Sequence, residues 1–556
     1  MFSVDAFIAA LSALNIISAF LLSIYALHQG VLFVLFLRSH LSRSRSPCAS
    51  ESRQSQPDQS LNASISDGRW PCVTVQAPLY NEQFVAQRLI EALCRLDYPA
   101  ELLQIQVLDD STDDTARIAQ AAVEAGRAAG VPIELIHRDH RAGFKSGALA
   151  HALPLARGEF IVLFDADFIP PPDFLRRVLA PGGPFDDPEV GFVQTRWGYL
   201  DRDTAPLKRA QALLLDMHFG VDQPARSSWR LPMNFNGSAG VWRRACIDAV
   251  GGWQSDTLTE DLDLSYRAQL AGWRGVYRLD LVSPGELPAS VISFKRQQAR
   301  WARGTAQCLR KLAGRVMRSS WSPARKLAGL MHLSGYMTYP LLFLLAVTAP
   351  LLAMNAHGQP IMPSWMSLIG LPGLLPMLSM FIAHCQQGRP VRHFARDLPA
   401  AVLLGIGLAW SNTLATVLGL LSPASGVFVR TPKLVAVQNA QRAVEGSSSH
   451  LTARHPILDE YTEAPDWTVI VEAGLALYVL GVCLMLARLG EWLAMLPLVL
   501  YGLSFSAIVL GQLVSVVKGR RRFTTSTLST LSLFSPSLQS PSHKSASSSS
   551  QMRSAD

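Results

Sequence analysis

The amino-acid sequence predicts an α/β domain with a mixed, mostly parallel sheet, inserted between membrane-spanning helices. Three observations lead to this prediction. Short apolar runs of strand type alternate with amphipathic helices in the first half of the chain. Long apolar runs stand before and after that region. The mean hydropathy is +0.20 while 17% of the residues are charged, which is typical of a membrane protein that carries a soluble domain.

The strand–helix alternation covers about residues 70–320 of the 556 residues. We expect strands at 72–77, 104–109, 133–137 and 160–164, and helices at 83–95, 113–129 and 145–155. Regular alternation of this kind implies a mostly parallel sheet that is covered by helices on both faces. The strands then end where the sheet opens into loops, and polar side chains at those ends are placed to hold a ligand.

The distribution of the basic residues indicates a membrane protein rather than a nucleic-acid-binding protein. The net charge is +8 and the pI is near 9.2, but the cations cluster beside the apolar runs, at Arg38–Arg45, Arg389–Arg396 and Lys518–Arg522. This is the positive-inside pattern, so no nucleic-acid partner is expected. The seven cysteines are scattered without a paired or metal-ligand spacing, which predicts no disulfide framework, no zinc site and a reducing compartment.

An N-terminal membrane helix is expected within residues 1–40. The run Val4–Leu37 contains no Lys or Arg and is long enough to span a bilayer. The arginines that follow place the N-terminus outside and the α/β domain in the cytoplasm. The Ser-rich residues 41–69 and 521–556 are predicted to be a disordered linker and a disordered tail.

Residues 321–520 form the predicted membrane region. Further spans are expected at Leu333–Met354, Pro363–His384, Val469–Leu489 and Trp492–Val517. The segment Leu398–Leu421 is also long enough to cross, but both of its flanks are basic, so we expect an interfacial helix that lies along or dips into the membrane. Five crossings with one interfacial helix are favoured, and six crossings are the alternative.

Acidic residues stand at the ends of two predicted strands. Asp109 and Asp110 end the second strand, and Asp165 and Asp167 follow the fourth. Alternation places the carboxylates of Asp165 and Asp167 on the same side, where two hard oxygen donors suit Mg²⁺ or Mn²⁺ shared with a diphosphate. The plainer interpretation is that such acids form turns and cap helices.

Three further patterns also allow two interpretations. Arg141–Leu149 combines two glycines with a lysine at a helix start, which favours an anion, although it is neither a Walker A sequence nor a dinucleotide fingerprint. Glu260 and Asp261 open a helix, either as first-turn acids or as part of a site. Gln297-x-x-Arg-Trp301 lies on a basic helix that could instead rest on anionic lipid.

Read in order, six motifs carry a family resemblance: Pro78-Leu-Tyr-Asn-Glu82, Asp109-Asp110, Asp165-Ala-Asp167, Thr259-Glu-Asp261, Gln297-x-x-Arg-Trp301 and Phe428-Val-Arg-Thr-Pro-Lys433. Together they resemble the membrane-bound family 2 glycosyltransferases, which have an inverting GT-A domain. Closer detail is similar to the cellulose synthase-like A and C branch of mannan and glucan synthases. That detail lies in Val107–Asp113, Gly143–Leu149, Gln194–Trp197, Phe235–Arg243 and Glu286–Pro288. The resemblance covers about residues 70–440.

The resemblance implies a role for each matching residue. The implied donor-binding residues are Asp109, Asp110, Lys145, Asp165, Asp167, Gln297, Thr431 and Lys433. Of these, Asp165 and Asp167 are implied to hold Mg²⁺ or Mn²⁺, while Thr431 and Lys433 belong to a gating-type loop within residues 422–466. The implied catalytic residues are Asp261, Glu260, Arg300 and Trp301, with Asp261 as the general base and Trp301 offering a face to the acceptor sugar.

The expected function is metal-dependent, inverting transfer of a hexose from UDP-glucose or GDP-mannose to a growing β-linked glucan or mannan, with export through the chain's own helices. Transfer to a membrane lipid is the alternative. A membrane scaffold with a degenerate transferase domain is a third possibility, against which the intact acidic motifs argue. The expected location is a plasma, inner or Golgi-like membrane, with the catalytic domain in the cytoplasm.

Overall fold

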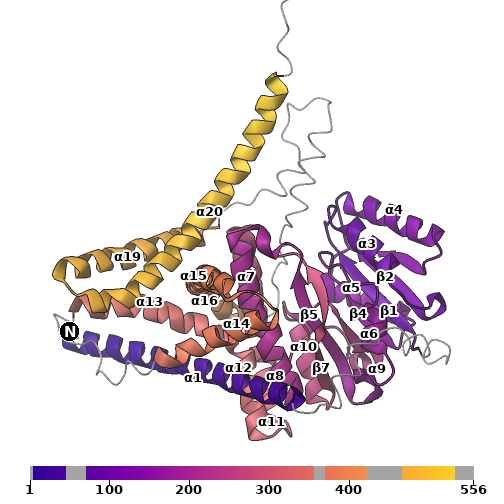
Figure 1. Ribbon diagram of the computed structural model, residues 1–556, viewed down its shortest axis with the longest axis horizontal. Coiled ribbons are helices and arrows are strands. Elements are labelled where there is room, and N and C mark those ends of the chain that lie inside the picture. The colour runs from indigo at the N-terminus through magenta and orange to yellow at the C-terminus, as the bar shows by residue number, and fades with distance from the viewer. Residues whose placement is uncertain (1–3, 45–69, 356–369, 423–465, 533–556) are drawn as a thin grey trace, which may run out of the picture.

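The structure is a computed structural model that describes residues 4–44, 70–355, 370–422 and 466–532. A sheet with its covering helices lies at one end of the molecule, long helices lie side by side at the other, and α20 (Trp492–Ser532) extends away from both (Figure 1). Residues 45–69 of the predicted linker and residues 423–465 of the gating-type loop, with Thr431 and Lys433, lie outside the described residues. The first four residues of the predicted linker instead continue the helix α1 (Val4–Ser44).

One seven-stranded sheet forms the centre of the α/β domain, in the order β3-β2-β1-β4-β6-β5-β7. Its strands are β1 (Val73–Leu79), β2 (Leu103–Asp109), β3 (Ile133–His137), β4 (Phe160–Leu163), β5 (Val190–Tyr199), β6 (Gly240–Arg243) and β7 (Arg274–Gly285). Neighbouring strands are parallel except at β6, which is antiparallel to β4 and β5. The prediction of a mixed, mostly parallel sheet is therefore confirmed.

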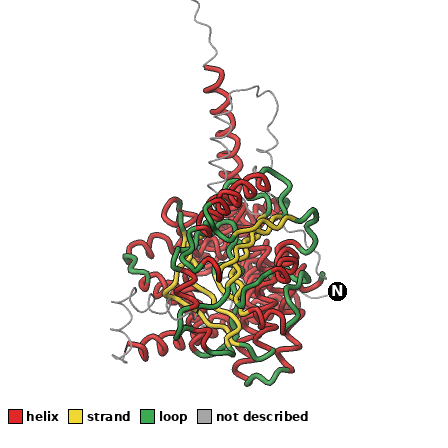
Figure 2. Tube along the Cα trace, turned by 90° about the vertical axis from the view of Figure 1, so that its right-hand side faces the viewer, coloured by secondary structure: helices red, strands yellow, loops and turns green. Residues whose placement is uncertain are grey.

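Strand residues alternate between two buried apolar layers. In β4, Phe160 and Val162 belong to one layer, and Ile161 and Leu163 belong to the other. Because both faces are buried, such strands have continuous apolar sequences. Helices flank the strands on both sides (Figure 2). The first layer contains α3 (Ala86–Cys94) and α4 (Thr115–Ala128), and the second contains α5 (Phe144–Ala152) and α9 (Arg244–Ala249).

The four predicted strands correspond to β1–β4, with ends that differ by at most two residues. The sequence analysis assigned no strand to β5, β6 or β7. β6 has only four residues, and the polar run Gln194–Arg196 interrupts the apolar pattern of β5, so periodicity gives a weak signal for both. The antiparallel β6 also breaks the regular alternation that the first four strands follow.

Four of the described helices are long and apolar enough to cross a membrane: Val4–Ser42, Gly335–Met354, Thr468–Leu489 and Trp492–Val517. They correspond to four of the five predicted crossings. The remaining one, Pro363–His384, lies partly outside the described residues, and its described helix α14 (Leu374–Gln386) is too short to span by itself. Five crossings therefore stay a prediction.

The predicted interfacial helix is broken in the structure. α15 (Val391–Gly407) and α16 (Ala409–Leu421) meet at a bend of 44°. The two helices pack closely against different partners. A Cβ on Gly407 would lie 2.6 Å from the carbonyl oxygen of Ser504 in α20, and one on Gly419 would lie 2.4 Å from that of Arg303 in α11. The helix on each side of the bend is thus packed against a different partner.

The last helix, α20, overlaps the first residues of the predicted tail, and a disordered tail stays a prediction. α20 continues to Ser532, whereas the sequence analysis placed disorder from residue 521. Ser and Thr have only moderately low helix propensities, and extending an existing helix costs much less than starting one. Their abundance therefore does not end α20.

α11 (Val291–Arg318) joins the α/β domain to the long apolar helices. Near its start, the Nζ of Lys295 donates to Glu472 Oε2 of α19 (Thr468–Leu489) at 2.9 Å and to Asp466 Oδ1 at 3.0 Å. Gln512 of α20 donates to the same oxygen of Glu472 at 2.9 Å. Lys295 is 2% exposed and Glu472 is fully buried, so these opposite charges compensate each other where water cannot.

We expect Lys295→Met to lower the melting temperature of the full chain in detergent by several degrees. The change would leave the Glu472 carboxylate buried without its cation, which typically costs about 3–5 kcal/mol. Lys326→Met, the same change at a half-exposed lysine of α12 (Pro323–Leu333), is the matched control. Equal melting temperatures for the two variants would contradict a role of this cluster in attaching α11.

Candidate active site

A cleft opens at the carboxyl ends of β1 and β4 and is bordered by α10 (Glu260–Leu270) and α11. Its volume is about 210 Å³. The predicted site residues that line it are Asp110, Lys145, Asp165, Asp167, Glu260, Asp261, Gln297, Arg300 and Trp301. A larger cavity of about 510 Å³ lies along β5 and contains none of the predicted site residues. The smaller cleft is therefore the candidate active site.

Asp109 and Asp110 point in different directions. The Asp109 carboxylate is fully buried, accepts a hydrogen bond from the Ser111 amide at 3.1 Å and lies 2.8 Å from Nδ1 of His137. It does not line the cleft. Asp110 does, and both of its carboxylate oxygens accept hydrogen bonds from the Arg138 guanidinium. Of the two acids, the structure thus brings only Asp110 to the cleft.

An aromatic–cation pair lies beside Asp110. The guanidinium carbon of Arg141 is 3.3 Å from the centroid of the Tyr80 ring, and both residues line the cleft. Stacking of this kind keeps the planar guanidinium parallel to a flat apolar surface. The pair offers a platform and a positive charge next to the Asp110 carboxylate.

Lys145 lies between the acids of two different elements. Its Nζ is 2.6 Å from Asp165 Oδ1 and 3.8 Å from Glu260 Oε1, and it donates to the carbonyl oxygen of Gly237 at 2.8 Å. Burial by itself lowers the pKa of Lys145, but the charges of Asp165 and Glu260 outweigh it and raise the pKa above the ordinary value. The ammonium group therefore stays charged and compensates the surrounding carboxylates.

The carboxylates of Asp165 and Asp167 both line the cleft, as a pair of metal ligands would require. The described residues contain no group of three or more His, Cys, Asp or Glu side chains that could hold a metal ion by themselves. Two hard oxygen ligands leave coordination positions for phosphate oxygens and water, which is the usual arrangement for Mg²⁺ at a phosphate-bearing substrate. The residues present fit a divalent ion shared with a diphosphate.

Asp261 lies in the first turn of α10, opposite Lys145. Its Oδ1 accepts a hydrogen bond from the amide of Leu262 at 2.8 Å. Burial and the negative charge of Glu260 raise the pKa of Asp261 to about 7, against the opposing charge of Lys145. A carboxyl group with a pKa near neutrality can accept a proton during a reaction and release it afterwards.

α11 presents Gln297, Arg300 and Trp301 to the cleft, because residues three and four apart lie on one face of a helix. Burial lowers the pKa of Arg300, and the negative charge of Glu260, followed by that of Asp165, opposes this effect. An arginine remains charged in either case. Arg300 is therefore a second permanent cation beside the acids.

One turn further along α11, Gly304 allows the helix to approach the start of α10. A Cβ at this position would lie 2.6 Å from the methyl group of Thr259 and 2.9 Å from its backbone nitrogen. No side chain larger than hydrogen fits in this space. The close contact sets the distance between Arg300 on α11 and the acids of α10.

Residues 71–304 match the family model described as "Glycosyltransferase like family 2". These residues form a family 2-like glycosyltransferase domain. The predicted family resemblance is thereby confirmed for this domain, and so is its GT-A-type fold. Thr431 and Lys433 lie beyond the matched residues and outside the part of the chain that the structure describes.

The chain is 40% identical to glucomannan 4-beta-mannosyltransferase 2 of Arabidopsis thaliana over 261 residues, which are 46% of this chain and 48% of the relative. It is 34% identical to the probable glucomannan 4-beta-mannosyltransferase 9 of Oryza sativa subsp. japonica over 335 residues, 56% and 62% of the two chains. It thus spans about half the length of the curated relatives it matches. A solved structure, the mannosyltransferase PcManGT of Pyrobaculum calidifontis with GDP-Man and Mn²⁺, is 21% identical, with a TM-score of 0.46 and coverage of 74% of this chain and 99% of that chain.

Three residues of the glycosyltransferase domain stand at the cleft or contact its lining although the sequence analysis gave them no role. Glu286 is 7% exposed, lines the cleft and pairs with Arg88 at 2.7 Å. Asn236 lines it as well, and its Oδ1 accepts from Gln223 at 2.7 Å. Arg138 contacts Asp110. Arg138 could have been found, because it directly follows β3, whose carboxyl end lies at the same edge as that of β2.

Gly237 shows how tightly the glycosyltransferase domain packs around its acids. Its φ is +81°, and a Cβ would lie 3.0 Å from Asp261 Oδ2. We expect Gly237→Ala to lower the melting temperature by a few degrees, because a left-handed conformation costs a residue with a Cβ about 1–2 kcal/mol. Gly405→Ala in α15, where the added Cβ meets nothing within 4 Å, should leave the melting temperature equal or higher. A variant Gly237→Ala as stable as wild type would contradict this strain.

Proposed function

We propose that the chain is an inverting hexosyltransferase that moves a sugar from a nucleotide-diphosphate sugar to a growing β-linked polysaccharide. One observation carries the proposal. In a family 2-like domain, the acids Asp165, Glu260 and Asp261 converge with the cations Lys145 and Arg300 in a single cleft. This is the charge pattern that sugar transfer from a diphosphate requires, since both a base and compensation for a departing anion are needed.

The donor half of the proposed site lies at the ends of β2 and β4. Asp110 with its partner Arg138, and the stacked pair of Tyr80 and Arg141, are proposed to bind the nucleoside. Asp165 and Asp167 are proposed to hold Mg²⁺ or Mn²⁺ against the diphosphate, where the ion would neutralise negative charge. Lys145 and Gln297 complete the donor contacts.

The acceptor half is proposed to lie between α10 and α11. Asp261 would take the proton of the acceptor hydroxyl as its oxygen attacks the anomeric carbon, and the nucleoside diphosphate would leave from the opposite side with the bonding electrons. Such a single displacement inverts the anomeric configuration. Burial and the charge of Glu260 keep the pKa of Asp261 high. Arg300 would offset charge on the leaving diphosphate, and the ring of Trp301 would offer a face to the acceptor sugar.

GDP-mannose is the favoured donor, because the similar curated proteins are named glucomannan 4-beta-mannosyltransferases. UDP-glucose is the other donor to be tested. The four long apolar helices support a membrane-bound enzyme, for which we propose a cytoplasmic domain and export of the product through its own helices. Thr431 and Lys433 are proposed to close over the nucleotide, on the sequence resemblance alone.

Purified full-length protein with GDP-mannose and Mg²⁺ or Mn²⁺ is expected to release GDP and to form a high-mass product that a β-mannanase digests. The same reaction with UDP-glucose tests glucan synthesis. Release of nucleotide without any polymer would contradict the proposal. A labelled product that partitions into organic solvent would instead support transfer to a lipid acceptor.

We expect the transfer rate to fall about tenfold for each pH unit below about pH 7, because a base must be ionised and the pKa of Asp261 is raised to about 7. Above that pH the rate should level off. Asp261→Asn should lower the transfer rate by at least about a hundredfold. Its affinity for the donor, measured by calorimetry, should stay close to that of wild type.

Asp256→Asn is the matched control for this prediction. Asp256 is an exposed acid on the loop before α10 and pairs with Lys311 outside the cleft, so its loss should leave the rate and the pH profile nearly unchanged. Unchanged turnover in Asp261→Asn would remove Asp261 from the role of base. The transfer rate of the wild-type protein is measured from about pH 5.5 to about pH 8, a range that brackets the pKa of Asp261. A rate that stays constant over this range would contradict the raised pKa of Asp261.

A further inference from the structure

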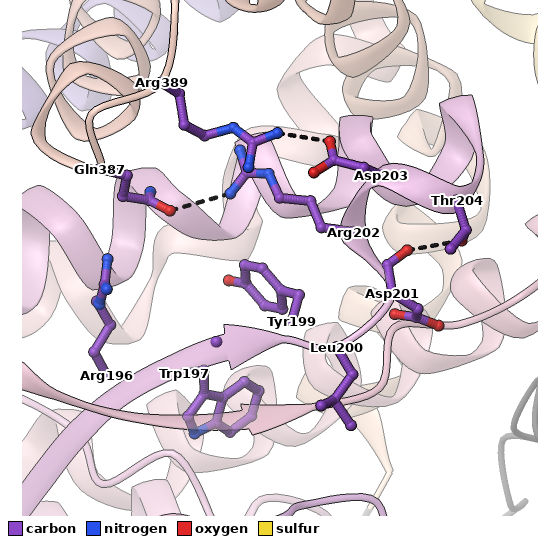
Figure 3. A pocket seen from close by; sticks show the side chains of 11 residues that line it. Arg196, Trp197, Tyr199, Leu200, Asp201, Arg202, Asp203, Thr204, Gln387 and Arg389 are labelled. Atoms are coloured by element: carbon purple, nitrogen blue, oxygen red, sulfur yellow. Dashed lines mark hydrogen bonds and ion pairs between the residues drawn. The ribbon is translucent and has the colours of Figure 1, made fainter.

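The larger cavity lies between the carboxyl end of β5 and the connection from α14 to α15. Its volume is about 510 Å³. Arg196 and Tyr199 come from β5, Arg202 from the turn after it, and Gln387 and Arg389 from the connection between the helices, and their side chains point into the same space (Figure 3). The α/β domain and the membrane region thus both contribute to one polar cavity.

Each carboxylate in or beside this cavity has a basic partner. Asp203 pairs with Arg389 at 2.6 Å, and Asp216 pairs with Arg202 at 2.6 Å. The remaining pair, Asp201 with Lys208, lies at the edge of the cavity. The negative charges of the cavity are therefore already compensated. Arg202 is 7% exposed and also donates to Gln387 Oε1 at 3.3 Å, so this part of the wall is tied together by ionic and polar contacts.

Arg196 is the cation that remains. Among the described residues, no carboxylate lies within ion-pair distance of its guanidinium, and its buried Nε has no hydrogen-bond partner. The register of β5 against β7 shifts between Thr195 and Arg196, and such an irregularity re-aims the side chains that follow it. A buried donor of this kind needs an acceptor, or its desolvation remains uncompensated.

Tyr199 supplies a second donor at the same wall. Its hydroxyl oxygen is buried without a hydrogen-bond partner among the described residues. Burial, reinforced by the negative charge of Asp216, raises the pKa of Tyr199 well above its usual value, so the hydroxyl keeps its proton. A guanidinium and a phenolic hydroxyl, both lacking an acceptor, therefore face one cavity (Figure 3).

We propose that this cavity binds a phosphate ester, with Arg196 as its principal anion contact and Tyr199 as a second donor. A planar guanidinium matches two phosphate oxygens at once. The cavity volume is in the range of sites for small organic ligands, so an ester fills it better than a bare phosphate ion would. The proposal concerns a second site and does not depend on the proposed sugar transfer.

Two sources could supply a phosphate ester here. Gln387 and Arg389 lie between helices of the membrane region, which is where the headgroup of an anionic phospholipid would be within reach. A soluble ester such as glycerol 3-phosphate carries the same chemistry. Trp197 lines both this cavity and the candidate active site, so occupation of the cavity is expected to change the fluorescence of its indole.

The test uses the full-length protein in nanodiscs. In phosphatidylcholine discs, glycerol 3-phosphate is titrated while tryptophan fluorescence is recorded. Retention of phosphatidylglycerol against phosphatidylcholine is measured separately by native mass spectrometry. Wild type is expected to show saturable binding in at least one arm, and Arg196→Gln should weaken it about tenfold, as loss of a charge-assisted contact does. Tyr199→Phe, which removes only a hydroxyl, should weaken it by a smaller factor of about three.

Arg117→Gln is the matched control, because it removes the same charge from a side chain that is 75% exposed on α4, away from the cavity. Its binding should equal that of wild type. Binding of the lipid alone would assign the site to a headgroup, and binding of the soluble ester would assign it to a free ligand. Absence of binding in both arms, or equal binding by Arg196→Gln and Arg117→Gln, would overturn the proposal. If Arg196→Gln does not fold, the binding by Tyr199→Phe is compared with that by Arg117→Gln instead, and equal binding by these two variants would overturn the proposal.

Discussion

The candidate site depends on cations that balance three neighbouring carboxylates in a confined cleft. Asp165, Glu260 and Asp261 come from the end of β4 and the start of α10, and Lys145 interacts electrostatically with all three carboxylates. Without a cation, three neighbouring carboxylates in a partly buried cleft would repel one another and lose hydration, and they would take up protons instead. Lys145 and Arg300 bring positive charge to the same cleft. Burial, followed by the negative charge of Glu260, raises the pKa of Asp261 to about 7 against the opposing charge of Lys145.

The helix α11 connects the cleft to the long apolar helices. Arg300 stands on α11, and α11 is held at its start by the buried Lys295–Glu472 pair and near its middle by the close approach of Gly304 to Thr259. The helix that carries Arg300 and Trp301 thus also contacts α19, whose Glu472 is bonded in turn to Gln512 of α20.

The cavity beside β5 differs from the cleft in its balance of acidic and basic side chains. In the cleft, acids exceed their cations, which suits a divalent ion and a proton acceptor. Along β5 the acids are matched by partners, and Arg196 is left over. Two sites of opposite electrostatic character thus lie on either side of Trp197–Tyr199.

The sequence by itself determined β1–β4, the long apolar helices and the placement of Asp110 and Asp165 at one edge, because these follow from local periodicity and from the common direction of parallel strands. Only the tertiary structure decided that Asp109 turns to His137, while Asp110 faces the cleft. Only the tertiary structure brought Asp261 and Arg300 into the cleft that Asp110 and Asp165 line. The bend between α15 and α16 and the cavity at Arg196 also arise from contacts between segments far apart in the chain, and no local pattern encodes such contacts.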